Sequence, residues 1–219
     1  MFSRFFLQKK QETMAPLQKS SLVVTNPVWT RILTALVLLT IMPCCSLEPK
    51  EPLPILGTID VPYTFTNQDG APVSQALFAN RVYVADFFFT SCPTICPVMK
   101  SQMLRIYESF SDQDNILLLS HTIDPEHDTV DVLHDYAERL EISTARWHLV
   151  TGPKTEIYDT AKRYMLGAME DKQAPGGFIH SGSFCLVDQA GRIRGYYRGT
   201  EEESVDRLIK DIKRLLNET

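Results

Sequence analysis

The amino-acid sequence predicts an α/β fold in which helices flank a central mixed sheet. Three observations support this fold class: apolar segments of strand length alternate with amphipathic segments of helical length, a hairpin pattern follows them, and an amphipathic helix comes last. Such alternation is typical of a mostly parallel sheet, to which the hairpin would add antiparallel strands. Without an N-terminal segment, about 175 residues remain, which suits one domain with a substantial core.

The first predicted elements are a hairpin, a strand and a helix. Residues 63–74 contain the turn Asn67-Gln-Asp-Gly70 between short apolar segments, which predicts a hairpin. Residues 82–89 are apolar apart from Asp86, as strands are when both faces of a sheet are covered. A helix should start at Pro97, because proline lacks the N–H group that would be unpaired at a first helical position.

A second buried strand is predicted over residues 115–123 and a third over residues 146–150. Between them, apolar residues at helical spacing predict a helix that reaches Leu140. Asp128 or Thr129 can cap the N-terminus of this helix, because a short side chain with an oxygen atom accepts a hydrogen bond from a free backbone N–H.

The C-terminal part should form a helix, a loop, a hairpin and a last helix. Gly152-Pro153 opens the first of these helices, and residues 166–179 lack periodicity and are predicted to be a loop. Residues 183–198 contain Gln-Ala-Gly between two apolar segments, which predicts a hairpin. Thr200 and Glu203 match a capping box before the final helix.

An apolar run of eleven residues, 32–42, precedes Cys44 and Cys45. This run is shorter than the roughly twenty residues of a membrane span but matches the apolar region of a secretory signal. We therefore expect residues 1–46 to be a signal, lipoprotein or membrane-anchor segment, with acylation of Cys44 or Cys45. An uncleaved signal-anchor and an ordinary signal with incidental cysteines are the alternatives, and Met14 is an alternative start.

Residues 47–56 contain three prolines among charged residues and are predicted to be an extended tether, which leaves residues 57–219 as the folded domain. Residues 1–44 carry five basic residues and one acidic residue, so the remainder of the chain has a net charge of −9 within the total of −5. An acidic domain argues against nucleic-acid binding, which relies on basic patches.

Cys92 and Cys96 lie four positions apart, directly after the strand predicted over residues 82–89. Each precedes a proline, which disfavours the α region, so the pair should belong to a loop. Cys96 should lie at the N-terminus of the following helix, where the macrodipole favours a thiolate. The pair by itself fits a metal site, a structural disulfide or a redox couple, and an exported protein meets the oxidants that would close a disulfide.

The predicted order of elements matches the thioredoxin plan, except that three residues rather than two separate the cysteines. Over residues 55–216 the chain resembles the Sco/SenC family of copper-binding thioredoxin-like proteins. The resemblance rests on residues 90–97 (TSCPTICP), on residues 122–129 (TIDPEHDT), and on His180-Ser181 ahead of a strand that His180 should open.

Two residues depart from the family pattern, because Thr94 and Ile179 stand where acidic residues are common. Neither is a metal ligand. The resemblance implies that Cys92, Cys96 and His180 bind one copper ion, as Cu(I) or Cu(II). Two thiolates and an imidazole suit Cu(I), and added oxygen or nitrogen donors would suit Cu(II), whereas zinc normally takes a fourth ligand.

The remaining candidate residues have structural interpretations. Asp124 and Asp128 fit turn formation and helix capping, and the family resemblance implies that their turn helps to present the metal loop. Cys185 alternates with apolar residues in a predicted strand and fits a core position, while an auxiliary thiol role stays open. The other histidines are interpreted as structural or solvated: His121, His127, His134 and His148.

By resemblance, the function is that of a copper metallochaperone that assists assembly of the binuclear copper site of cytochrome c oxidase. Its partner would be the copper-site subunit of that oxidase or another copper or thiol protein. It would face the periplasm or another extracytoplasmic space from a membrane anchor. The alternatives are a thiol-disulfide oxidoreductase that uses Cys92 and Cys96 without metal, and a copper or redox sensor. Beyond that redox pair no catalytic residue is expected, and His180 separates the first two functions because thiol exchange does not require it.

Overall fold

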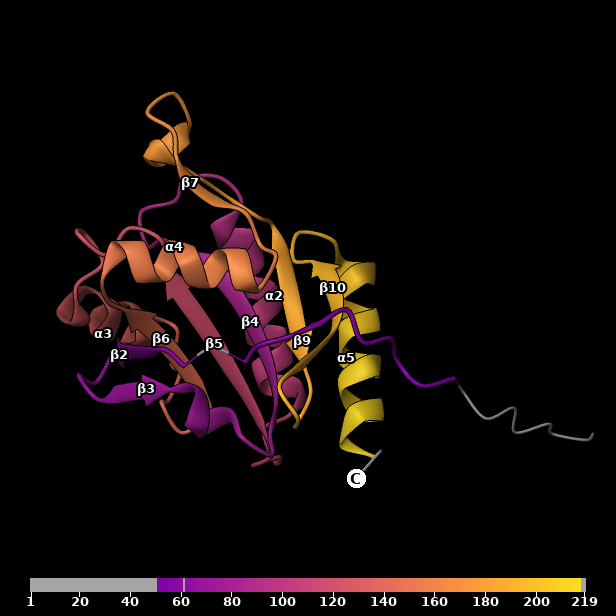
Figure 1. The fold of residues 1–219 in the computed structure, drawn as a ribbon. Helices are drawn as coiled ribbons and strands as arrows, with labels where there is room; N and C mark the ends of the chain where they lie inside the picture. The colour runs from indigo at the N-terminus through magenta and orange to yellow at the C-terminus, as the bar shows by residue number, and fades with distance from the viewer. Residues whose placement is uncertain (1–50, 61, 218–219) are drawn as a thin grey trace, which may run out of the picture. The chain divides into compact units, whose positions relative to one another are not determined.

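A computed structural model describes residues 51–60 and 62–217, and within them eight strands form one sheet in the order β1-β10-β9-β4-β5-β6-β2-β3 (Figure 1). Two more strands, β7 and β8, form a separate hairpin. The predicted segment 1–46, with Cys44 and Cys45, lies outside the described residues. The strands are β1 (Gly57–Thr58), β2 (Thr64–Asn67), β3 (Pro72–Ser74), β4 (Val82–Phe88), β5 (Ile116–Thr122), β6 (Trp147–Thr151), β7 (Ala168–Glu170), β8 (Phe178–His180), β9 (Ser183–Val187) and β10 (Arg192–Arg198). The helices are η1 (Gln75–Phe78), α2 (Cys96–Ser109), α3 (Val130–Arg139), α4 (Lys154–Arg163), η2 (Pro175–Gly177) and α5 (Glu202–Leu216).

The centre of the sheet is parallel and both edges are antiparallel. β4 pairs with β5 and β5 with β6 in parallel, whereas β9 joins β4 and β2 joins β6 in antiparallel orientation. The predicted mixed sheet is therefore confirmed, but the prediction that it is mostly parallel is wrong. The hairpins β2–β3 and β9–β10 account for the difference, because each adds antiparallel strands to one side of the parallel centre.

Helices cover both faces of this sheet. α2 contacts α5, and Lys100 of α2 and Tyr136 of α3 both pack on Phe88 of β4, so these three helices share one face. α4 crosses the other face (Figure 1), where Tyr164 after its last turn packs against Phe87 with ring centroids 6.0 Å apart. Consecutive residues of β4 thus point into two different layers, as the alternation of a strand requires.

The predicted loop over residues 166–179 contains a small hairpin instead. β7 and β8 pair with Ala168 opposite His180, and Figure 1 shows the hairpin projecting from one end of the domain. In η2, Gly176 has a φ of 79°, and a Cβ there would lie 2.8 Å from the Phe89 ring, so only glycine fits this position. Strands of three residues carry too little alternation to be recognised in a sequence. His180 ends β8 rather than opening the next strand as predicted.

Of the two predicted helix caps, the one at α3 is confirmed and the one at α5 is wrong. Thr129 caps α3 by accepting a hydrogen bond from the Val132 N–H at 3.4 Å. α5 follows Glu201, which makes no side-chain capping bond, so the capping box predicted at residues 200–203 is wrong. Acidic residues in the first turn of α5 still favour its N-terminus through the macrodipole.

The end of the predicted tether lies against β10. The Arg194 guanidinium donates to the backbone oxygens of Leu53 and Pro54 at 2.6 and 3.1 Å. Residues 53 and 54 are therefore fixed to the edge of the domain.

The part of the chain that the structure describes contains no helix that is long and apolar enough to cross a membrane.

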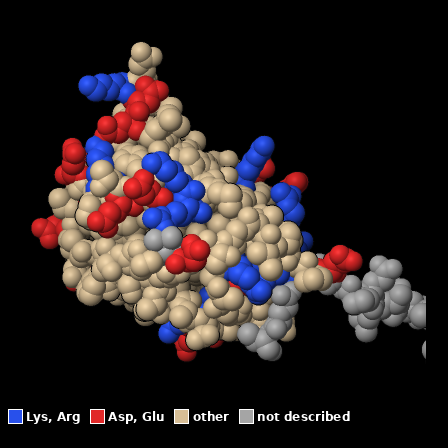
Figure 2. Space-filling model, viewed as in Figure 1, with Lys and Arg blue, Asp and Glu red and all other residues tan. Residues whose placement is uncertain are grey.

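On the face drawn in Figure 2, acidic and basic side chains are interspersed.

Candidate metal centre

The cysteine loop begins where β4 ends and closes at the first turn of α2. The Cys92 N–H donates to the Phe89 carbonyl at 3.3 Å, which turns the chain after the strand. Cys96 is the first residue of α2 and Pro97 follows it, where a missing N–H breaks no hydrogen bond. The predicted loop leading into a helix is confirmed, although the helix includes Cys96 and so starts earlier than predicted.

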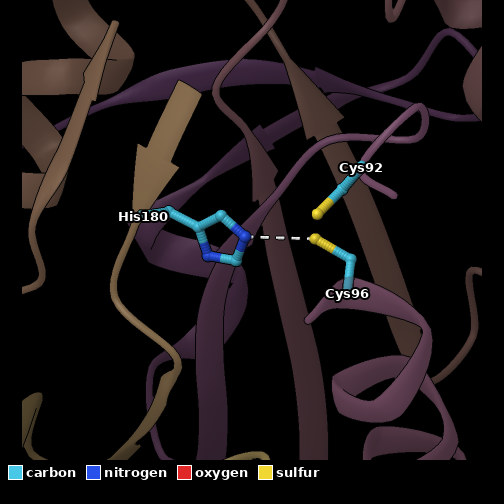
Figure 3. A group of neighbouring side chains, drawn as sticks. All are labelled: Cys92, Cys96 and His180. Carbon is cyan, nitrogen blue, oxygen red and sulfur yellow. Dashed lines mark hydrogen bonds between the residues drawn. The ribbon is translucent and has the colours of Figure 1, made fainter. Parts of the chain in front are cut away.

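His180 brings an imidazole ring to the two sulfur atoms. Its Nε2 lies 3.1 Å from Cys96 Sγ, and the donor atoms of Cys92, Cys96 and His180 all lie within 4.8 Å of one another. All three residues are buried. Figure 3 shows the ring, which comes from the end of β8, pointing toward the sulfur atoms of the loop and of α2. Residues 84 positions apart in the chain therefore meet in one buried group.

The surroundings of His180 favour a neutral ring with a free lone pair on Nε2. Burial lowers the pKa of His180, so the ring is uncharged at neutral pH. Its Nδ1 lies 3.1 Å from the Ser181 carbonyl oxygen, to which only a protonated Nδ1 can donate. We therefore assign the proton to Nδ1, which leaves the lone pair of Nε2 directed at Cys96 Sγ and available as a metal donor.

The two thiols differ in acidity. Burial acts to raise the pKa of Cys92, but hydrogen bonds from the Cys96 thiol and from the backbone of Thr94 and Cys96 outweigh burial and lower this pKa. Burial raises the pKa of Cys96 well above its usual value and the neighbouring Cys92 adds to the rise, while the Lys100 ammonium acts against it. The prediction that the helix N-terminus makes Cys96 the thiolate is therefore wrong, and Cys92 is the more acidic thiol.

The donor set fits a soft metal ion. Two thiols and a neutral imidazole are the ligands that Cu(I) prefers, and a cavity of about 760 Å³ lined by Cys92 and Cys96 opens beside them. Among the described residues, no fourth histidine, cysteine or carboxylate joins the group. A structural zinc site would normally be closed by such a fourth ligand.

Asp128 fixes the start of the cysteine loop from the connection between β5 and α3. Its buried carboxylate accepts hydrogen bonds from the Thr90 N–H at 3.0 Å and from the hydroxyls of Thr90 and Thr122. It also lies 2.9 Å from His127 Nδ1. These partners occupy its oxygens, so the predicted capping role of Asp128 is wrong. The predicted turn at Asp124 is confirmed, because its carbonyl accepts the N–H groups of His127 and Asp128.

A buried ion pair under the cysteine loop was not predicted from the sequence. Lys100 is 3 % exposed and donates to Asp86 at 3.1 Å and to Ser120 at 3.2 Å. The Trp147 indole N–H donates to the same Ser120 oxygen at 3.0 Å, and the Ser120 hydroxyl donates to Asp86. The ammonium also lies 3.9 Å from the centre of the Phe88 ring. The sequence feature that could have indicated this ion pair is Asp86, the one charged residue in an otherwise apolar strand.

The other four histidines stay outside the donor group. His121 and His148 are buried in the core, whereas His127 and His134 are about half exposed beside carboxylates. Cys185 is fully buried in β9, as its predicted core position requires.

The family model described as SCO1/SenC matches residues 56–217. A SCO1 protein homolog of Bacillus subtilis (strain 168) is 32% identical over 181 residues, which cover 81% of this chain and 92% of the relative. Among solved structures, BsSco is described as a member of the Sco family of cytochrome c oxidase assembly proteins with a disulfide switch. It matches with a TM-score of 0.65 and 30% identity over 74% of this chain and 96% of its own.

ScoI of Bradyrhizobium japonicum, solved with copper bound, matches with a TM-score of 0.61 and 21% identity, covering 71% of this chain and 98% of its own. Sco proteins have a thioredoxin-like fold, so this part of the fold prediction is confirmed.

Proposed function

This chain belongs to the SCO1/SenC family, and from that membership we propose that it is a copper metallochaperone in which Cys92, Cys96 and His180 bind one copper ion. The observation that carries the proposal is the approach of His180 Nε2 to Cys96 Sγ at 3.1 Å, with Cys92 in the same buried group. Thiol exchange needs only the two sulfur atoms, whereas a neutral imidazole directed at them adds a metal donor.

Copper is the cargo of this site rather than a structural ion. Two soft thiolates and one imidazole suit low-coordinate copper, and the copper bound to the related ScoI supports the same metal here. The adjoining cavity leaves the sulfur side of the site accessible. A partner's ligands can therefore reach the copper ion and replace the protein's donors one at a time, while the released thiolates take up protons and no electron is transferred.

The recipient that best fits is the copper-site subunit of cytochrome c oxidase. Support comes from the similarity to BsSco, which is described as belonging to a family of assembly proteins for that oxidase. Another copper or thiol protein outside the cytoplasm could receive copper through the same ligand exchange.

The N-terminal segment would hold the domain at the outer side of the cytoplasmic membrane. The apolar run over residues 32–42 followed by Cys44 and Cys45 supports a cleaved and acylated signal. Mass spectrometry of the membrane-extracted protein tests this, because an intact segment 1–43 would identify an uncleaved anchor instead.

X-ray absorption of the Cu(I)-loaded protein tests the ligand set. We expect sulfur and nitrogen scatterers together, with one copper ion retained per chain against a competing chelator. A first shell of sulfur alone, or loss of copper to the chelator, would count against the proposed site.

A second function is favoured by one observation, the unequal acidity of the two thiols. An acidic Cys92 beside a protonated Cys96 has the arrangement of an attacking and a resolving thiol in disulfide exchange.

His180→Ala separates the two functions, because it removes the imidazole and leaves both thiols. If the protein is a metallochaperone, the variant should fail to support oxidase assembly and should bind copper more weakly. Loss of a residue that only hydrogen-bonds to a metal ligand already lowers affinity about 10- to 100-fold, so loss of a ligand itself should cost at least as much. The Cys92–Cys96 disulfide should still form, and Cys92→Ser should abolish both properties. Normal oxidase assembly with His180→Ala, but not with Cys92→Ser, would favour the oxidoreductase.

A further inference from the structure

Lys100 carries a full positive charge into the interior beneath the cysteine loop. Its ammonium is satisfied by the Asp86 carboxylate, the Ser120 hydroxyl and the face of the Phe88 ring. A lysine normally keeps its ammonium in water, so a lysine that is 3 % exposed is held inside by this set of partners. None of these three partners is a proposed metal ligand. The contacts of Lys100 therefore do not serve to orient a metal ligand, and the buried charge needs another explanation.

The lysine of the ion pair, and not the aspartate, lines the cavity beside the two cysteines. Lys100 follows Cys96 by four positions on α2, so the two side chains lie on the same face of the helix. Lys100, Cys92 and Cys96 line one cavity, whereas Asp86 does not line it. The Asp86 oxygens accept hydrogen bonds from Lys100 and from Ser120 of the neighbouring strand. The Lys100 side chain therefore lines the space beside the two cysteines, whereas the Asp86 side chain does not.

The oxidation state of copper changes the charge that this ammonium meets. Two thiolates, a neutral imidazole and Cu(I) together carry one net negative charge, whereas the same donors with Cu(II) are neutral. The electron that reduces Cu(II) therefore adds one negative charge near a buried cation. Water and salt screen such an interaction much less than they screen one at the surface.

We propose that the buried ammonium of Lys100 makes the site selective for Cu(I) over Cu(II), an inference that rests on the proposed copper-binding function. Lys100 is a positioning residue, because it acts on the metal through the charge of the Cys92 and Cys96 sulfur atoms. The protein would accept and deliver copper in the reduced form, and Cu(II) would be the more weakly held state.

The test compares Cu(I) and Cu(II) affinities of the full chain with those of the double variant Lys100→Gln/Asp86→Asn. This variant removes both charges and replaces them with amides that can hydrogen-bond to each other. Each affinity is measured by competition with a chelator for that oxidation state, and folding is checked by circular dichroism. We expect the ratio of Cu(I) to Cu(II) affinity to fall by roughly tenfold, which equals a fall of about 59 mV in the one-electron midpoint potential.

Arg105→Gln is the matched control. Arg105 lines the same cavity from the same helix, but its side chain is 30% exposed and paired with Glu202 and Asp206. Water screens its charge, so the affinity ratio should stay within about threefold of the unaltered protein. An equal fall with Arg105→Gln would show a nonspecific effect of net charge and would overturn the proposal.

A second double variant, Lys100→Met/Asp86→Leu, repeats the test with two apolar side chains in place of the ion pair. Replacing a buried ion pair in this way often causes no loss of stability. Copper binding with an unchanged affinity ratio in either folded double variant would overturn the role of Lys100. Failure of the unaltered protein to bind copper tightly would refute the metallochaperone function instead, so the two failures are distinguishable.

Discussion

The two faces of the strand pair β4–β5 bury ionisable groups in opposite ways. On the face covered by α2, Asp86 lies beside Ser120 and forms an ion pair with Lys100 in which the charged groups have hydrogen-bond partners. On the other face, the next pair in register is Phe87 and His121. The His121 ring stacks on Phe87 with centroids 4.7 Å apart, and neither of its nitrogen atoms has a hydrogen-bond partner.

The difference shows what each face can contribute. The face below the cysteines keeps a full charge because its partners replace water, and such a charge can act on the nearby proposed copper site. The opposite face accepts an imidazole only in its uncharged form, since burial lowers the pKa of His121 to about 4. The first face is therefore sensitive to the loss of a partner, and the second is sensitive to acid.

Of the substitutions on the two faces, Lys100→Met should lower the free energy of unfolding most, because it leaves the Asp86 charge buried without its partner. We expect a loss of about 3–5 kcal/mol in the free energy of unfolding, measured by urea denaturation at pH 7. The double variant Lys100→Gln/Asp86→Asn should recover most of the loss. Equal losses in the single and double variants would mean that packing, rather than an unpaired charge, sets the stability of this face.

Acidification should act mainly on the His121 face. The unfolded chain binds a proton at His121 below about pH 6.5, whereas the folded chain does not until about pH 4, so stability falls as the pH drops through this window. Between pH 7 and pH 4.5 this residue should cost roughly 2–3 kcal/mol of unfolding free energy.

His121→Phe tests this assignment, because phenylalanine cannot take up a proton. The variant should lose less stability than the unaltered protein between the same two pH values. The quantity compared is the change in unfolding free energy between the two pH values for each protein. A difference in stability between the two proteins at pH 7 therefore does not affect the result. Parallel pH dependences of the two proteins would exclude His121 as the acid-sensitive group.

Ser120→Ala should cost about 1–3 kcal/mol, because it leaves the Trp147 indole N–H without its acceptor and removes one partner of Lys100. Urea unfolding at pH 7 measures the loss, and Ser120→Thr is the control that keeps the hydroxyl. A loss below the measurement error would show that Ser120 is not needed to satisfy the charged network.

The smallest effect is expected from the double variant Tyr83→Phe/Tyr164→Phe on the His121 face. It removes both hydroxyls of a buried hydrogen bond of 3.0 Å, so neither hydroxyl is left without its partner. The free energy of unfolding should change by less than about 1 kcal/mol. A larger loss would show that this face also depends on polar contacts, and the contrast between the two faces would weaken.

Local patterns in the sequence predicted the elements that build the site. The apolar run of β4, the prolines after both cysteines and the helical spacing after Pro97 are short-range signals, and the structure places each of them as expected. The third proposed donor has no such signal, because His180 is 84 positions from Cys96 and only the family resemblance assigned it.

The errors arose where contacts distant in sequence outweigh a local pattern. Asp128 has the position of a helix cap, but Thr90 and Thr122 provide it with other hydrogen bonds. Cys96 begins a helix, which favours an acidic thiol, but burial raises the pKa of this thiol. Lys100 lies in the buried stripe of α2 beside Cys96, and its pairing with Asp86 depends on the packing of α2 against β4, which no local pattern encodes.

The separation of the donors along the chain has a consequence for biosynthesis. A chain made or exported from its N-terminus presents both cysteines before the segment that carries His180 has emerged, and the β7–β8 hairpin must form before the imidazole reaches them. Incomplete chains therefore have two thiols but lack the third of the proposed copper ligands. Truncated or misfolded copies would then hold copper more weakly than complete ones, so retention of copper against a chelator would report that a molecule has finished folding.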